Sequence, residues 1–156
     1  METKLNELNI KYKLITHNSS GKTTEQAEKA LNEKKENIIK SILLKNEKEE
    51  YLGIILLGNS KIDFSKLKNI TNAVFNYKNN KFSFCPKEKV KEVLGYEIGG
   101  VPPIAFFIKN IPTIIDSKVI TQEYVIGAGG NEYTGLKLMN SEIKKIPGKI
   151  MKISKI

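Results

Sequence analysis

Two strand-length apolar runs, separated by a short charged segment, constrain the fold of this chain most strongly. The first run covers residues 37–45 (NIIKSILLK) and the second covers residues 50–57 (EYLGIILL). Both are rich in isoleucine and leucine, and the segment 46–49 between them is polar and short. This pattern predicts a hairpin of two strands, so a β-sheet is expected at the centre of the fold.

The rest of the chain predicts further short strands with short helices between them. Helices are expected after Thr23 or Thr24, from Asp63 to Leu67, over 86–94 and over 141–146, with a turn or short helix over 117–121. Strands are expected over 11–16, 72–77, 104–108, 113–115, 123–126, 135–139 and 149–153. Because strands do not alternate regularly with long helices, a doubly wound sheet is not expected. We predict a mixed α+β fold with one large, mostly antiparallel sheet or partial barrel, flanked by short helices.

The length of 156 residues predicts one domain over 1–156. Its core is expected over about 23–153, with a polar segment at 1–10 and a basic segment at 144–156. No run is apolar and long enough to span a membrane, and residues 1–13 do not resemble a secretion signal. One cysteine and one histidine exclude a disulfide framework and a Cys/His zinc site within the chain. A cytoplasmic protein without metal or cofactor is expected, as a monomer or weak homo-oligomer.

The chain is strongly basic, with a formal net charge of +9, and all 26 of its basic residues are lysine. Arginine, the usual bidentate ligand of phosphates and guanine edges, is absent. About half of the net charge lies in the segment 144–156, which holds five lysines and no acidic residue. That segment is either a solubilising end or an electrostatic contact for a polyanion such as RNA.

Common catalytic motifs are absent. The segment 19–23 (SSGKT) ends like a phosphate-binding loop, but Thr16 stands where that loop needs glycine. Glu132 likewise replaces the third glycine of a dinucleotide fingerprint that would begin at Gly127. Cys85 and His17 are distant in sequence, which favours structural roles for both and leaves any functional role open.

Lys40 interrupts the first apolar run. Strand alternation places it on the same face as Ile38, Ile42 and Leu44. A charge within an apolar strand must reach a sheet edge, a partner or a cleft. Lys40 is therefore either a lysine that extends outward from an edge strand or a residue of a binding site.

Two glycine-rich segments are also candidates for a site. They are 99–103 (GGVPP) and 127–130 (GAGG). Without side chains, such loops bring backbone N–H groups close to a ligand, where they can hold a carbonyl oxygen or a phosphate. Each loop on its own is better explained as a tight turn.

Four blocks in one order now resemble the YbaK/ProRS-associated editing domain family, the free-standing aminoacyl-tRNA deacylases. The blocks are 24–28 (TEQAE), 38–43 (IIKSIL), 95–103 (GYEIGGVPP) and 125–129 (VIGAG). The resemblance extends from about residue 23 to residue 153. It implies a mixed α/β fold and hydrolysis of the ester between a wrongly attached amino acid and the 3′-terminal adenosine of a tRNA.

The resemblance also implies roles for particular residues. Lys40, Gly127 and Gly129 would be catalytic, the lysine by holding the substrate and the glycine backbone by polarising the ester carbonyl or positioning water. The expected substrate-binding residues are Ser41, Gly99, Gly100, Val101, Pro102, Pro103 and Ala128. Ser41 stands where the family often has threonine, and Gly130 and Asn131 stand where it often has arginine, which weakens the expectation of RNA contacts there.

The implied substrate is a tRNA mischarged with a small amino acid such as cysteine, alanine, serine or threonine. An aminoacyl-tRNA synthetase is an expected partner. Two alternatives remain at this stage: a non-catalytic tRNA-binding or synthetase-associated module of the same fold, and hydrolysis of another small ester. Retention of Lys40 and both glycine loops favours the enzyme.

Overall fold

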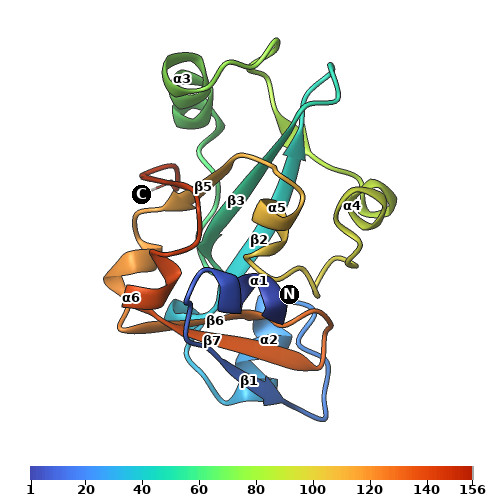
Figure 1. The fold of residues 1–156 in the computed structure, drawn as a ribbon, viewed down its shortest axis with the longest axis vertical. Helices are drawn as coiled ribbons and strands as arrows, with labels where there is room; N and C mark the ends of the chain where they lie inside the picture. Colours follow the sequence, from blue (N-terminus) through green and yellow to red (C-terminus); the bar gives the residue numbers. More distant parts are fainter. Residues whose placement is uncertain (156) are drawn as a thin grey trace.

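The computed structural model describes residues 1–155, and its strands form two sheets. The five-stranded sheet has the order β4 (Ser83–Phe84), β2 (Ile39–Lys45), β3 (Tyr51–Leu57), β5 (Thr113–Asp116) and β8 (Lys149–Met151). The three-stranded sheet has the order β1 (Lys13–Thr16), β7 (Thr134–Met139) and β6 (Tyr124–Ala128). In Figure 1 the β2–β3 hairpin runs upright, and β6, β7 and β1 lie across its lower end.

The predicted hairpin is confirmed. β2 and β3 pair antiparallel over seven residues, from Ile39 opposite Leu57 to Lys45 opposite Tyr51. β5 and β8 then extend this sheet in parallel. The mixed α+β class is also confirmed, but the strands form two sheets where one large sheet was expected. The sheets meet at a single parallel bridge between Ile38 and Ile126, which leaves the arrangement short of a closed barrel.

Short helices surround the sheets. They are α1 (Glu2–Glu7), α2 (Thr24–Leu31), α3 (Phe64–Val74), α4 (Lys87–Leu94), α5 (Ala105–Ile108) and α6 (Asn140–Ile143), with 3-10 turns η1 (Lys35–Asn37) and η2 (Val119–Thr121). Thr23 caps α2 in a reciprocal capping box with Gln26, and the Asp63 carboxylate caps α3. Gly95 ends α4 in the left-handed conformation, at φ +80°. Among residues 1–155, no helix is long and apolar enough to cross a membrane.

Two predicted strands are wrong. Within the predicted strand 104–108, Ala105–Ile108 form α5, because Phe106 is fully buried against β3 at Gly53. A Cβ atom at Gly53 would lie 2.4 Å from Cγ of Phe106, so this close packing outweighs the strand preference of the segment. Residues 72–74 continue α3, which buries Leu67 and Thr71, one helical turn apart.

The β3 strand is buried on both faces, which explains its uninterrupted apolar sequence. Leu43 and Ile55 face one core cluster with Phe106, and Leu44 and Ile54 face a second cluster. The polar segment 1–10 is also folded, because α1 buries Leu5 in the first cluster. The site described below therefore rests on a rigid sheet.

The basic segment 144–156 is part of the fold as far as residue 155. Its strand β8 pairs with β5, and Ser154 bridges to Ile62. The buried Asp116 carboxylate accepts hydrogen bonds from the backbone N–H groups of Ile153 and Ser154, at 2.9 and 3.1 Å. These contacts argue against a loose, disordered end.

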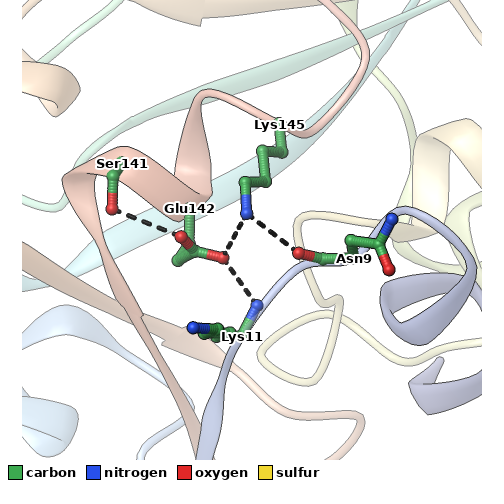
Figure 2. Close-up of polar contacts among 5 residues, drawn as sticks. All are labelled: Asn9, Lys11, Ser141, Glu142 and Lys145. Atoms are coloured by element: carbon green, nitrogen blue, oxygen red, sulfur yellow. Dashed lines mark hydrogen bonds and ion pairs between the residues drawn. The ribbon is translucent and has the colours of Figure 1, made fainter.

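A second polar cluster, here called the Glu142 latch, joins α6 to the N-terminal segment (Figure 2). It consists of Asn9, Lys11, Ser141, Glu142 and Lys145. Oε1 of Glu142 accepts hydrogen bonds from the backbone N–H of Lys11 at 2.7 Å and from Nζ of Lys145 at 3.0 Å. Nζ of Lys145 also donates to the carbonyl of Asn9 at 2.9 Å. The pKa of Glu142 is lowered, chiefly by the Lys11 hydrogen bond and then by Lys145.

Candidate functional site

The candidate site lies where β2 and β6 separate. The two strands run in parallel from the Ile38–Ile126 bridge and then diverge, and we call the space between them the fork. A cavity of about 280 Å³ occupies the fork. Its walls come from five parts of the chain, namely 17–31, 38–42, 98–101, 126–128 and 131–135.

The cavity brings together six of the ten predicted site residues. Lys40 and Ser41 lie on one side and Gly127 and Ala128 on the other, and Gly99 and Val101 complete this set. Gly100, Pro102, Pro103 and Gly129 do not line the cavity itself. Pro103 supports it from behind, because a Cβ atom at Gly127 would lie 3.4 Å from Cδ of Pro103.

Lys40 reaches the cavity from strand β2 of the five-stranded sheet. Its side chain is half-buried, and Nζ donates a hydrogen bond to the carbonyl oxygen of Gly58 at 3.3 Å. Among residues 1–155, no carboxylate lies within 4.0 Å of this ammonium group, and the Coulombic influence of Glu25 acts from farther away. Burial is the main cause of the lowered pKa of Lys40, with Lys61 adding to it and Glu25 opposing it. A half-buried ammonium with unused donors is suited to bind an oxygen-rich ligand.

The backbone directions in the fork differ from the expected ones. The N–H of Gly129 donates to the carbonyl of Thr134 at 2.8 Å. Because hydrogen-bonded pairs alternate along an antiparallel ladder, the N–H of Gly127, opposite Leu136, also points to β7. Neither glycine therefore offers its amide to a substrate. By the same alternation, the amide of Ala128 points away from β7, toward the fork.

The backbone of Ser41, like that of Ala128 on the opposite side of the fork, points toward the fork. The N–H of Gly58 donates to the carbonyl of Ile38 at 2.6 Å, which fixes the hydrogen-bonded pairs of β2 with β3. Lys40, opposite Leu56, belongs to that set, so the backbone of Ser41 points to the other edge of β2. The fork thus has backbone amides of Ser41 and Ala128 on its two sides and the Lys40 ammonium beside them.

The comparison with known families agrees with this geometry. The aminoacyl-tRNA editing domain family matches residues 18–146, which is most of the chain. The chain belongs to this family. The match includes every part of the chain that lines the cavity except His17.

Curated relatives of this editing domain are much longer proteins. It is 29% identical over 126 residues to a proline–tRNA ligase of Brachyspira hyodysenteriae and 29% identical over 129 residues to one of Thermodesulfovibrio yellowstonii. These regions are 81% and 83% of this chain but 21% of each ligase. The chain therefore spans about a fifth of the length of these relatives.

Solved structures share the fold. A hypothetical protein of known crystal structure has a TM-score of 0.86 at 19% identity, over 99% of this chain and 98% of that one. A candidate trans-editing enzyme for prolyl tRNA synthetase has a TM-score of 0.75 at 22% identity, over 93% and 87% of the two chains. At these identities the comparison establishes the fold of the editing domain.

Several cavity residues of the editing domain were not expected from sequence. They include Lys22, Thr24, Asn131, Glu132 and Thr134. Ser20 Oγ donates to the Glu132 carboxylate at 2.5 Å, and the N–H of Gly21 donates to the Glu132 carbonyl at 2.6 Å. Lys22, Asn131 and Glu132 lie in loops without periodicity, whereas Thr24 begins α2 and Thr134 begins β7. The sequence signal for Asn131, Glu132 and Thr134 was their proximity to the glycine-rich block 127–130, and Thr24 opens the block 24–28.

His17 and Cys85 have different positions. His17 lines the cavity, and its Nδ1 lies 2.6 Å from the carbonyl of Ser19, so Nδ1 is the donor of this pair. Cys85 is buried outside the cavity, and burial raises the pKa of its thiol. In residues 1–155, no three His, Cys, Asp or Glu side chains gather into a metal-binding group.

Proposed function

We propose that this editing domain is a trans-acting aminoacyl-tRNA deacylase. It hydrolyses the ester that joins a wrongly attached small amino acid, such as cysteine, alanine, serine or threonine, to the 3′-terminal adenosine of tRNA. The observation that carries the proposal is Lys40, a half-buried ammonium that has no carboxylate within 4.0 Å among residues 1–155 and lies in a cavity beside the backbone amides of Ser41 and Ala128. Membership of the editing domain family supports the same substrate class.

Lys40 is proposed to hold the substrate. An ammonium group has three donors, and the carbonyl of Gly58 takes one of them. The remaining donors bind an oxygen of the terminal nucleotide, either a phosphate oxygen or the ester carbonyl. Partial burial strengthens this interaction, because water competes less well for the charge.

The backbone amide of Ala128, or that of Ser41 across the fork, is proposed to stabilise the reacting carbonyl. A water molecule attacks the ester carbon, and the carbonyl oxygen becomes an oxyanion that accepts a hydrogen bond from the amide. The bond from the carbon to the ribose 3′-oxygen then breaks, and that oxygen takes the proton lost by the water. The products are the free amino acid and a tRNA with its terminal hydroxyl restored.

The proposed partner is the mischarged tRNA itself, met free or on an aminoacyl-tRNA synthetase. The curated relatives are proline–tRNA ligases, which contain a matching region within a much longer chain. The proposed substrate is therefore tRNA that a synthetase has charged wrongly. A monomer or weak homo-oligomer is sufficient, because one chain contributes every wall of the cavity described here.

Deacylation of a tRNA panel tests the proposal. The panel carries cysteine, alanine, serine, threonine or proline, and wild type is compared with Lys40→Ala. Wild type is expected to hydrolyse one or two species, and the variant to lose about 100-fold or more in kcat/KM, as for loss of an electrostatic catalytic group. Lys45→Ala is the matched control, because Lys45 lies on the same strand, is also half-buried and does not line the cavity.

Two results contradict the proposal. Equal turnover by Lys40→Ala and wild type would show that Lys40 has no role in hydrolysis. Absence of hydrolysis by a folded wild-type protein that binds tRNA would identify a non-catalytic tRNA-binding module instead.

A further inference from the structure

A second groove continues from the cavity at the mouth of the fork. Its volume is about 340 Å³, and it shares the residues Lys22, Ile98, Asn131 and Glu132 with the cavity. Its other lining residues include the aromatic rings of Tyr96 and Tyr133 and the amine of Lys91. A ligand that fills the cavity can therefore extend into the groove without leaving the protein surface.

Tyr133 has an exposed ring on a fixed backbone. Its N–H donates to Oδ1 of Asn131 at 2.8 Å, and its carbonyl accepts from the N–H of His17 at 2.9 Å. The side chain is nevertheless 46% exposed. Among residues 1–155, the hydroxyls of Tyr12, Tyr77 and Tyr124 donate to Glu2, to the Tyr51 carbonyl and to Glu33, whereas that of Tyr133 has no such bond. The backbone of Tyr133 is therefore fixed, and its ring is open to solvent.

Tyr96 provides a second aromatic surface across the groove. Its ring packs partly against the core and lies beside Gly130. Gly130 has φ +107°, a conformation that favours glycine, and a Cβ atom built there would lie 3.6 Å from Cε1 of Tyr96. The bare backbone at this position keeps the groove open beside the ring.

The charges of the groove suit a phosphodiester at the junction with the cavity. Lys22 lines both spaces, and it is exposed. Of the two carboxylates that line the groove, Glu97 pairs with Lys91 at 3.1 Å, whereas Glu132 accepts a hydrogen bond from Ser20 and keeps its charge. Lys22 is therefore the ammonium group that a phosphate at the junction would bind. Two rings and a lysine at the junction match a single-stranded nucleotide, whose base stacks and whose phosphate is anionic.

We infer that the groove between Tyr96 and Tyr133 binds the nucleotide that precedes the terminal adenosine of the tRNA. Its base stacks on Tyr133, and the phosphate that links it to the adenosine lies at Lys22. This inference rests on the proposed function, because that function places the adenosine in the cavity. Every base has a flat aromatic face that can stack on a tyrosine ring, so the groove contributes affinity rather than sequence selectivity.

Titration with short ribonucleotides tests the inference without any hydrolysis. The probes are adenosine monophosphate, CpA and UpA, and NMR chemical shifts give each Kd. Wild type is expected to bind CpA and UpA about 5- to 100-fold more tightly than adenosine monophosphate. Tyr133→Ala is expected to lose this gain and Tyr133→Phe to keep it. Phe84→Ala, which removes an exposed ring outside both spaces, is the matched control and should keep it.

The outcomes separate the groove from the cavity. Equal affinities of wild type for adenosine monophosphate and CpA would overturn the inference and leave the proposed function standing. The same gain in Tyr133→Ala as in wild type would also overturn it. If none of the three probes binds, both the inferred nucleotide site in the groove and the proposed adenosine site in the cavity are overturned.

Discussion

Lys40 in the fork and Lys145 in the Glu142 latch are two lysines that donate to backbone carbonyls, yet their surroundings differ. Lys145 donates to Asn9 and also pairs with the Glu142 carboxylate at 3.0 Å. Lys40 donates to Gly58 alone, and among residues 1–155 no carboxylate lies within 4.0 Å of it. The paired lysine has its charge satisfied within the protein. The lysine in the fork keeps donors available, as the binding role proposed for it requires.

The largest expected effect comes from replacing Lys40 by an apolar side chain of similar length. Lys40→Met should reduce kcat/KM for deacylation by about 100-fold or more. Thermal stability should be unchanged or higher, because burial disfavours the ammonium form and methionine removes that cost. Deacylation assays and thermal melts of the same preparation measure both. A large drop in Tm would contradict the distinction between Lys40 and Lys145, because it would show that Lys40 also has a structural role.

A substitution in the Glu142 latch should lower stability and leave deacylation unchanged, the opposite of the result expected for Lys40→Met. Glu142→Gln preserves the shape of a side chain that is only 8% exposed but removes its charge. A clear drop in Tm is expected, with deacylation at a permissive temperature unchanged, because the latch does not line the cavity. Lost turnover at unchanged Tm would couple the latch to the site and contradict the separation.

The pH dependence of that drop gives an independent check. The pKa of Glu142 is lowered below its ordinary value of 4.5, so its carboxylate stabilises the fold above that pH. The contribution should disappear as the pH falls through the lowered pKa. Thermal melts are measured from pH 7 downward. The difference in stability between wild type and Glu142→Gln should be constant near neutral pH and should decrease in acid. A difference that persists in strong acid would assign the effect to packing instead.

The smallest expected effect concerns the carbonyl that holds Lys40. Oγ1 of Thr24 donates to the same Gly58 oxygen at 3.4 Å. Thr24→Val should cost about 1 kcal/mol of stability and lower deacylation only a few-fold, because the Lys40 hydrogen bond remains. Thr121→Val is a suitable control, since that hydroxyl also donates to a carbonyl but lies outside the cavity. A loss of activity as large as that of Lys40→Met would mean that Thr24 acts directly on the substrate.

The sequence predicts the fold best where a single pattern dominates. The β2–β3 hairpin follows from two apolar runs, and the cap of α3 follows from Asp63. Residues 104–108 have strong strand preference but form a helix, because Phe106 fills the space above Gly53. A contact between residues so far apart in the chain leaves no local signal, so propensity alone could not predict it.

The site is predictable to a similar extent. Lys40 is conspicuous because a charge interrupts an apolar strand, and the structure places it in the cavity. The glycine blocks are conspicuous too, but their amide directions depend on ladder alternation, which points Gly127 and Gly129 to β7. His17 and Glu132 meet at the cavity only because β1 pairs with β7. Such distant pairing is not encoded in periodicity.

The pairing of β1 with β7 also sets the order in which parts of the fold can form during translation. Lys13 is opposite Lys137, so the three-stranded sheet joins two segments that lie far apart in the sequence. The β2–β3 hairpin, by contrast, is complete once residue 57 has emerged. Because contacts between distant segments form late, a nascent chain exposes Lys40 on a finished hairpin long before β6 and β7 close the other wall. A chain interrupted before residue 134 therefore carries Lys40 without the Thr134 and Gly135 wall of the cavity.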